Sequence, residues 1–173
     1  MRFYERNEFW TLVGVIIGFL LSALWEVIKN RLSICKKRRA IENELRTNLG
    51  FIPQKIDILK KLEASLNQKR ILPSDSVHYT TDLYDLYIGE VGLHLSEDQR
   101  GCLHVVYEHM KGVDRFLDST FRDFIEFRAS GQLSDPFEAF SGMCEDLIEK
   151  SNLTQDMIKE YLAGKPRKVS WDD

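Results

Sequence analysis

The most marked feature in the pattern of hydrophobic and polar residues is a run of twenty almost entirely apolar residues near the N-terminus. They run from Phe9 to Ile28 and contain one charged residue, Glu26. An α-helix of this length covers about 30 Å, which matches the hydrocarbon core of a bilayer. The mixed charges before it and the lack of a small-x-small exit do not indicate a cleaved signal peptide. The pattern predicts a transmembrane helix over 9–28 after a short extracytoplasmic segment at 1–8.

An amphipathic helical period follows the predicted span. Apolar residues recur at spacings of three and four from 41 to 66, the pattern of a helix with one buried face. Gly50 and Pro53 fall inside it. A proline removes one backbone hydrogen bond, so we expect the helix to be interrupted and kinked there. The positions that follow the period are Ile41, Leu45, Leu49, Ile52, Ile56, Leu59, Leu62 and Leu66.

A stretch without sustained periodicity separates this helix from the next. Residues 68–81 contain Pro73 and several small polar residues, so they predict a loop. Thr80 or Thr81 is expected to cap the following helix, because threonine hydroxyls accept hydrogen bonds from the free amides at helix starts. That helix carries Leu83, Leu86, Tyr87 and Val91 and is expected to fade near Gly92.

Start and stop signals mark two further helices. Ser96 followed by Gln99 is the pattern of a capping box, and Gly131 suits the position just after a helix end. After Ser134 and Asp135, a proline at position 136 favours the first turn of another helix. The apolar positions are Leu103, Val106, Met110, Val113, Leu117, Phe121 and Phe124 in the first helix, then Phe137, Phe140, Met143 and Leu147 in the second.

A short last helix is expected to close the predicted domain. It holds Met157, Ile158, Tyr161 and Leu162 before Gly164, and the tail at 165–173 is expected to be flexible. No segment shows the alternation of a strand. The sequence therefore predicts an all-α chain, in which one transmembrane helix precedes a bundle of four to five helices over 41–164.

Charge is divided unevenly along the chain. Residues 1–40 hold eight Lys and Arg against three Asp and Glu, whereas residues 41–173 hold sixteen against twenty-four. Six of the basic residues lie at 29–40, a segment that we call the collar. This bias predicts a protein of the cell inner membrane with its N-terminus outside and its C-terminal domain in the cytoplasm. So acidic a domain is not expected to bind DNA or long RNA.

Small and polar residues recur every four positions along the predicted span. Gly14, Gly18, Ser22 and Glu26 share one side of the helix, which we call the stripe. Small residues let helix backbones approach closely, and Ser and Glu prefer a protein or water neighbour to lipid. Three interpretations stay open: plain self-association, chance in a span that tolerates glycine, and a face that meets water or lines a pore. Self-association and pore formation both predict a homo-oligomer.

The predicted loop collects groups that bind phosphorylated bases. Lys69 and Arg70 supply two cations, His78 a titratable ring and Tyr79 an aromatic face. Arginine forks to phosphate oxygens, and an aromatic ring stacks on a base. In a ring of identical subunits, a small cyclic anion on the axis meets each group once per subunit. These four residues form a candidate ligand site, and an ordinary solvated loop is the alternative.

Signatures of catalysis and of bound cofactors are missing from the sequence. It has no phosphate-binding loop, dinucleotide fingerprint, nucleophile elbow or zinc-protease motif. His104, Glu108 and His109 have one residue too many for an inverted zinc motif, so we interpret them as ordinary polar positions. Three distant cysteines suggest neither a metal site nor disulfides. We therefore expect no cofactor, no metal and no enzymatic activity.

The order of parts resembles a known family. A single N-terminal span, a basic collar and a compact helical domain without a catalytic motif are similar to the membrane effectors that accompany type III CRISPR systems. In size the chain looks most like those whose cytoplasmic domain senses cyclic tetra-adenylate. The resemblance implies an antiviral effector that forms a homotetramer, in which binding of cyclic oligoadenylate to the cytoplasmic domain perturbs the membrane. The alternative interpretation is a membrane-anchored scaffold that holds a protein partner.

Overall fold

Two compact units make up the chain in the computed structural model. The structure describes residues 4–71, 76–131 and 135–168, and of residues 4–9 the backbone alone. The units are Met1–Arg39 and Ala40–Asp173. All elements among the described residues are helical, which confirms the all-α class. The predicted N-terminal segment falls partly in the first helix, and the last five residues of the predicted tail lie outside the described residues.

The first unit is the N-terminal part of helix α1 (Tyr4–Asn67). Apart from the half-buried Val13, its large apolar side chains from Trp10 to Leu32 are exposed, with Phe19 at 73%. This segment is long and apolar enough to cross a bilayer by its length and composition. Exposed apolar surface of this extent requires a nonpolar covering, either lipid or another protein chain.

Helix α1 crosses from the first unit into the second and continues through Gly50 and Pro53 to Asn67. The predicted interruption at these two residues is wrong, whereas the predicted kink stays a prediction. Pro53 lies on an exposed position of the helix, where water can satisfy the carbonyl that loses its amide partner.

The end of α1 is a turn that usually contains glycine. Lys69 adopts a left-handed conformation with φ of 56°. The amide of Lys69 donates to the carbonyl of Leu66 at 2.8 Å, and the amide of Arg70 donates to the carbonyl of Ser65 at 2.9 Å. These two bonds close the helix as a Schellman motif with lysine at the glycine position.

A short helix, α2 (Asp82–Val91), and a 3-10 turn, η1 (Gly92–His94), follow. The predicted end of this helix near Gly92 is confirmed. Thr81 occupies the N-cap position, but its side chain makes no capping hydrogen bond. The expected role of a threonine hydroxyl is therefore wrong, and the amides at the start of α2 find another acceptor, described below.

Helix α3 (Glu97–Ser130) begins and ends at the predicted signals. The Ser96 hydroxyl accepts from the Gln99 amide at 3.2 Å, and the Gln99 side chain accepts from the Ser96 amide at 3.0 Å. The capping box is thus confirmed. Gly131 follows the helix with φ of 67°, a conformation in which glycine avoids the clash of a Cβ atom.

Helix α4 (Pro136–Leu162) starts at the predicted proline and runs unbroken to the end of the bundle. Ser134 lies outside the described residues. The predicted separation of a short last helix is wrong. Ser151 and Thr154 sit in the middle of α4, and their hydroxyls donate to carbonyls four residues earlier at 2.6 and 2.8 Å. These polar residues are therefore accommodated within the helix.

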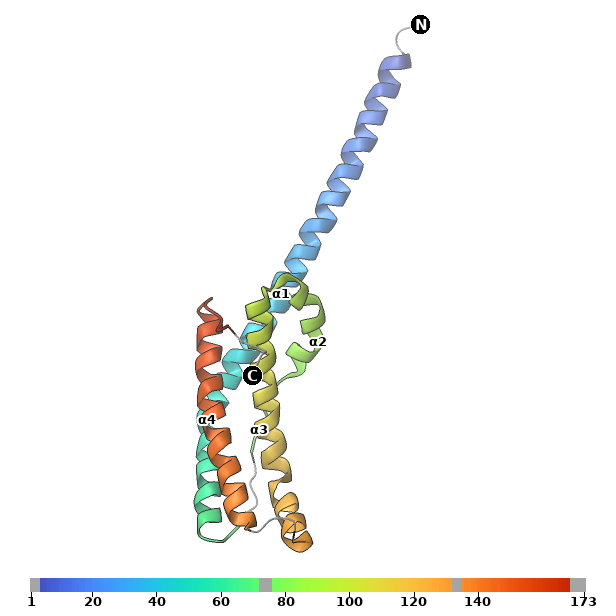
Figure 1. The fold of residues 1–173 in the computed structure, drawn as a ribbon. Coiled ribbons are helices and arrows are strands. Elements are labelled where there is room, and N and C mark those ends of the chain that lie inside the picture. Colours follow the sequence, from blue (N-terminus) through green and yellow to red (C-terminus); the bar gives the residue numbers. More distant parts are fainter. Residues whose placement is uncertain (1–3, 72–75, 132–134, 169–173) are drawn as a thin grey trace. The chain divides into compact units, whose positions relative to one another are not determined.

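In the second unit, α3 and α4 lie side by side and the C-terminal part of α1 runs beside α4 (Figure 1). The hydroxyl of Ser141 in α4 donates to the side-chain oxygen of Asn67 in α1 at 2.9 Å. The three long helices bury a shared core of Ile41, Leu45, Ile52, Leu59, Leu66, Leu103, Val106, Met110, Val113, Phe124, Phe140 and Ile158.

Three apolar residues that were assigned to buried faces are exposed. They are Leu86 in α2, Phe121 in α3 and Met143 in α4. In α2 Tyr84 is buried instead of Leu86, and in α3 Thr120 is buried instead of Phe121. Each of the three exposed residues fits a spacing of three or four, but another residue of the same helix faces the core.

Candidate functional site

A buried ion pair joins helices α1 and α3. The ammonium of Lys55, a residue only 2% exposed, forms a salt bridge with the carboxylate of buried Asp114. The same ammonium donates to the Ser76 hydroxyl at 2.8 Å and lies 5.1 Å from the centre of the Tyr79 ring. The second oxygen of Asp114 accepts from the Tyr79 amide at 2.8 Å. The pair therefore holds the non-helical segment before α2 against the bundle.

A second carboxylate holds the start of α2. Glu44 in α1 accepts from the amides of Leu83 and Tyr84 at 2.9 and 3.1 Å. It also accepts from the hydroxyl of Tyr107 in α3 at 2.8 Å. Amides at a helix start have no partner within the helix, and negative charge is favourable there. Glu44 is thus the cap of α2, supplied from another helix.

Asn48 lies between these two groups on α1. Its side chain donates to the carbonyl of Thr80 at 2.6 Å and accepts from the amide of Thr80 at 2.9 Å. No buried side-chain nitrogen or oxygen among the described residues lacks a hydrogen-bond partner. We call the set that holds residues 76–84 the clamp, and it consists of Glu44, Asn48 and Lys55 from α1 with Tyr107 and Asp114 from α3.

The tyrosines at the clamp are held neutral. Burial raises the pKa of Tyr107 far above its ordinary value, and its hydrogen bond to Glu44 raises it further. Burial, together with the negative charges of Asp85 and Glu108, raises the pKa of Tyr84 to about 12. The two rings stack with their centres 3.8 Å apart. Tyr107 therefore keeps the proton that it donates to Glu44.

The four residues of the predicted ligand site fall in two places. Lys69 and Arg70 are exposed just beyond the end of α1, whereas Tyr79 contacts Lys55. From Lys55 to the end of α1 the helix rises by roughly 20 Å. The Tyr79 ring belongs to a residue only 6% exposed, so it offers no face to an external base in this conformation.

His78 precedes Tyr79 in the chain and, unlike Tyr79, is exposed. Its ring nitrogens lie 3.7 Å from a carboxylate oxygen of Asp114 and 3.6 Å from one of Asp118. Carboxylates at this distance repel a phosphate. The structure therefore does not assemble the four predicted residues within one chain, and their contact with a ligand in an assembly stays a prediction.

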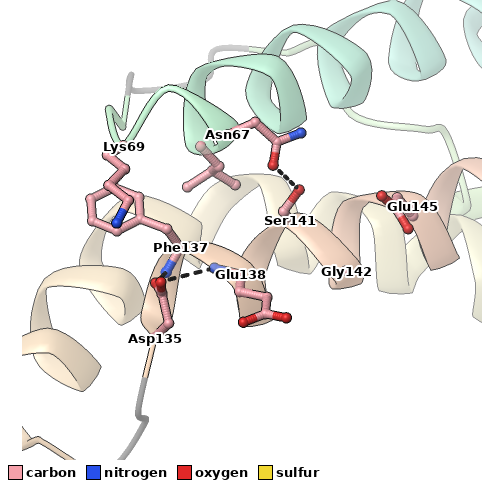
Figure 2. A pocket seen from close by; sticks show the side chains of 9 residues that line it. Asn67, Lys69, Asp135, Phe137, Glu138, Ser141, Gly142 and Glu145 are labelled. Carbon is pink, nitrogen blue, oxygen red and sulfur yellow. Dashed lines mark hydrogen bonds between the residues drawn. The ribbon is translucent and has the colours of Figure 1, made fainter.

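An open hollow of about 420 Å³ lies between the end of α1 and the start of α4 (Figure 2). Lys69 shares it with the carboxylates of Asp135, Glu138 and Glu145. The lining thus carries three carboxylates against one ammonium, and this net negative charge disfavours an anionic ligand here. The remaining lining residues are Leu66, Asn67, Phe137, Ser141 and Gly142.

The stripe occupies exposed positions of α1. A Cβ atom added at Gly14 or Gly18 would meet no other atom within 4 Å. Packing within one chain therefore requires neither glycine. Ser22 and Glu26 continue the same side of the helix, so the small and polar surface is available to a second helix.

Comparison with known proteins assigns no family. No protein-family model, curated protein or solved structure matches this chain. The features of this chain that indicate a function are the exposed apolar segment, the stripe and the clamp.

Glu108 and His109 of α3 both have partners close by. The carboxylate of Glu108 lies 3.9 Å from the Lys111 ammonium and 3.6 Å from the Arg115 guanidinium. The His109 ring is 3.0 Å from the Thr154 hydroxyl, and burial, with Lys150 nearby, lowers the pKa of this histidine. In the part of the chain that the structure describes, no group of three His, Cys, Asp or Glu is placed to hold a metal ion.

Proposed function

We propose that this chain is a single-span membrane effector whose cytoplasmic helical domain responds to a ligand. Residues 9–28 anchor the chain, and the collar keeps the helical domain on the cytoplasmic side. The stripe joins several copies into a homo-oligomer. A change at the clamp alters α1, and with it the packing or the opening of the spans.

The observation that carries this proposal is that a single helix, α1, contains both the exposed apolar segment and three residues of the clamp. A buried ion pair adds little stability compared with apolar residues of the same volume, and its better-attested role is to specify one arrangement over another. Here the pair holds a non-helical segment, and such segments are the parts of a fold that open most readily.

Cyclic oligoadenylate, and cyclic tetra-adenylate in particular, is the ligand that we propose first. Support comes from the order of parts along the chain and from the exposed Lys69, Arg70 and His78, which repeat around the axis of an oligomer. The carboxylates beside Lys69 and His78 stand against it.

Isothermal titration of the detergent-solubilised full-length protein with cyclic tetra-adenylate tests the ligand. We expect saturable binding that Arg70→Ala weakens by about tenfold, because a charge-assisted hydrogen bond to phosphate contributes roughly 1.5 kcal/mol or more. Arg46→Ala, at an exposed position of α1, is the matched control and is expected to leave the affinity unchanged. An absence of binding would end the nucleotide proposal and leave the anchor to be judged separately.

The anchor and its orientation are tested at Cys35, a natural thiol in the collar. Cys35 is exposed, whereas Cys102 and Cys144 are buried, and burial raises the pKa of both buried thiols, that of Cys144 to about 12. We expect a membrane-impermeant maleimide to label the protein in inverted membrane vesicles, where the collar faces the added reagent, and not in intact cells, where the collar faces the cytoplasm. The label is expected at Cys35, because an exposed thiol forms the reactive thiolate more readily than a buried one.

Cys35→Ser gives the background for this experiment. Labelling in intact cells would reverse the proposed orientation. Recovery of the full-length protein in the soluble fraction after lysis would remove the anchor altogether.

A membrane-anchored scaffold is the second candidate, and exposed apolar residues of α2 and η1 favour it. Leu86 and Leu93 are 66% and 80% exposed. A stoichiometric protein partner that copurifies with the detergent-solubilised chain would support the scaffold. A homo-oligomer without other components would count against it.

A further inference from the structure

An exposed apolar face runs along α2 and η1. Leu86, Gly89 and Leu93 recur at spacings of three and four on the side opposite the buried Tyr84, and we call these three residues the α2 face. Leu93 is the most exposed large apolar residue among those that the structure describes. A Cβ atom at Gly89 would meet no atom within 4 Å, so the surface between the two leucines is open. Exposed apolar residues that gather on one face mark a candidate site of interaction.

The charged residues of α2 itself are acidic. Asp82, Asp85 and Glu90 lie in α2, and residues 82–95 contain no Lys or Arg. From α3, the Lys111 ammonium lies 2.7 Å from Asp85 and the Arg100 side chain lies beside Gly92. Charge complementarity across an interface selects a partner that carries basic residues. A fitting surface must therefore combine cations with apolar side chains.

The collar has this composition. Lys29, Arg31, Lys36 and Arg39 are exposed, and the large side chain of Leu32 is exposed among them. Residues 29–40 contain no Asp or Glu. The chain thus carries one acidic apolar surface and one basic apolar surface, which are complementary to each other.

We propose that the α2 face of one copy docks on the collar of a neighbouring copy. The inference rests on the proposed function, because self-association of the spans brings the collars of different copies together. Leu32 of one copy then covers the leucines of the next, and the basic side chains of the collar meet Asp82 and Glu90. Each copy gives one α2 face and one collar, so the contact repeats around a closed ring.

Anionic lipid headgroups compete for the collar. They attract its basic residues, whereas the same headgroups repel the acids of α2. Charge therefore favours a basic protein surface over a bilayer as the partner of the α2 face.

Cross-linking of two differently tagged full-length chains tests the contact. One chain keeps Cys35, and the other carries Cys35→Ser together with Leu86→Cys. The two are co-expressed, and a short bismaleimide is added to isolated membranes. We expect a doubly tagged dimer in several-fold higher yield than in the matched control, in which the second chain carries Cys35→Ser with Leu153→Cys. Leu153 is an exposed leucine of α4. The yield should fall at high salt, because salt screens exposed charges.

Cross-links between Cys35 residues of otherwise unchanged copies report self-association on its own. If these form and Leu86→Cys gives no more product than Leu153→Cys, the docking contact is overturned and the oligomer stands. If neither product forms, self-association fails, and the proposed function fails with it. A product that joins Leu86→Cys to a different protein would also overturn the docking contact.

Discussion

Replacing Asp114 with alanine is expected to lower the free energy of unfolding of the helical domain by about 3 to 5 kcal/mol. The substitution leaves the ammonium of Lys55 buried without its carboxylate and removes the acceptor of the Tyr79 amide. An unpaired buried charge is among the most destabilising changes that a single substitution can make. Chemical denaturation of the full-length protein in detergent, followed by circular dichroism, measures the loss.

Asp118, one turn further along α3, provides the matched control. Its side chain is half exposed and lies 3.6 Å from the ring of His78, so Asp118→Ala is expected to change the stability by less than about 1 kcal/mol. The double variant Lys55→Met with Asp114→Leu removes both charges and is expected to regain most of the lost stability. Equal effects of Asp114→Ala and Asp118→Ala would show that the buried pair is dispensable.

Replacing Glu44 with alanine is expected to destabilise the domain by about 2 to 3 kcal/mol, because two amides and one hydroxyl lose a charged acceptor. The loss should appear first at α2, since the three long helices retain their apolar core. Hydrogen exchange followed by mass spectrometry measures this, and we expect the amides at the start of α2 to exchange about thirtyfold faster or more.

Two variants make the Glu44 experiment specific. Glu44→Gln keeps an acceptor oxygen in the same place and is expected to lose less than Glu44→Ala. Arg46→Ala changes an exposed residue two positions away and is expected to leave the exchange of α2 unchanged. Uniform acceleration across all helices after Glu44→Ala would mean that α2 does not open as a separate unit.

Helix starts and ends with a local chemical cause were predictable from the sequence. The capping box at Ser96 and Gln99, the glycine at 131 and the proline at 136 act within one turn of chain, so the residues that cause each feature stand next to one another. The predicted loop starts at residue 68, directly after the observed end of α1 at Asn67, although no glycine marks this end and Lys69 takes the conformation that glycine usually takes.

Features that depend on contacts between distant segments were not predictable. The sequence pattern placed Leu86 inside and did not single out Tyr84, yet Tyr84 is buried because its ring stacks on Tyr107. The cap of α2 comes from Glu44, forty positions away from the amides that it accepts. Periodicity reports which face of a helix is apolar, but it does not report which polar residue a tertiary contact will bury.

The predicted ligand residues illustrate the same limit. The predicted ligand site combines four residues because they are close in sequence, namely Lys69, Arg70, His78 and Tyr79. In the structure Tyr79 is turned into the core by Asp114 and Lys55, which are distant in sequence from it and from each other. One feature of the sequence does point to the clamp. Polar residues occupy positions 44, 48 and 55 on the apolar side of a predicted helix, which indicates that they are buried with polar partners.

The spacing of the clamp residues on α1 also limits how the chain can change in length. Each residue of an α-helix turns the following side chains by about 100°, so one inserted residue between Asn48 and Lys55 would rotate the lysine away from its carboxylate while Glu44 kept its place. An insertion in the connection between α1 and α2, ahead of residues 76–81 that the clamp holds, rotates none of these side chains. Insertions and deletions are therefore expected to be tolerated there and excluded from a stretch of three turns inside α1.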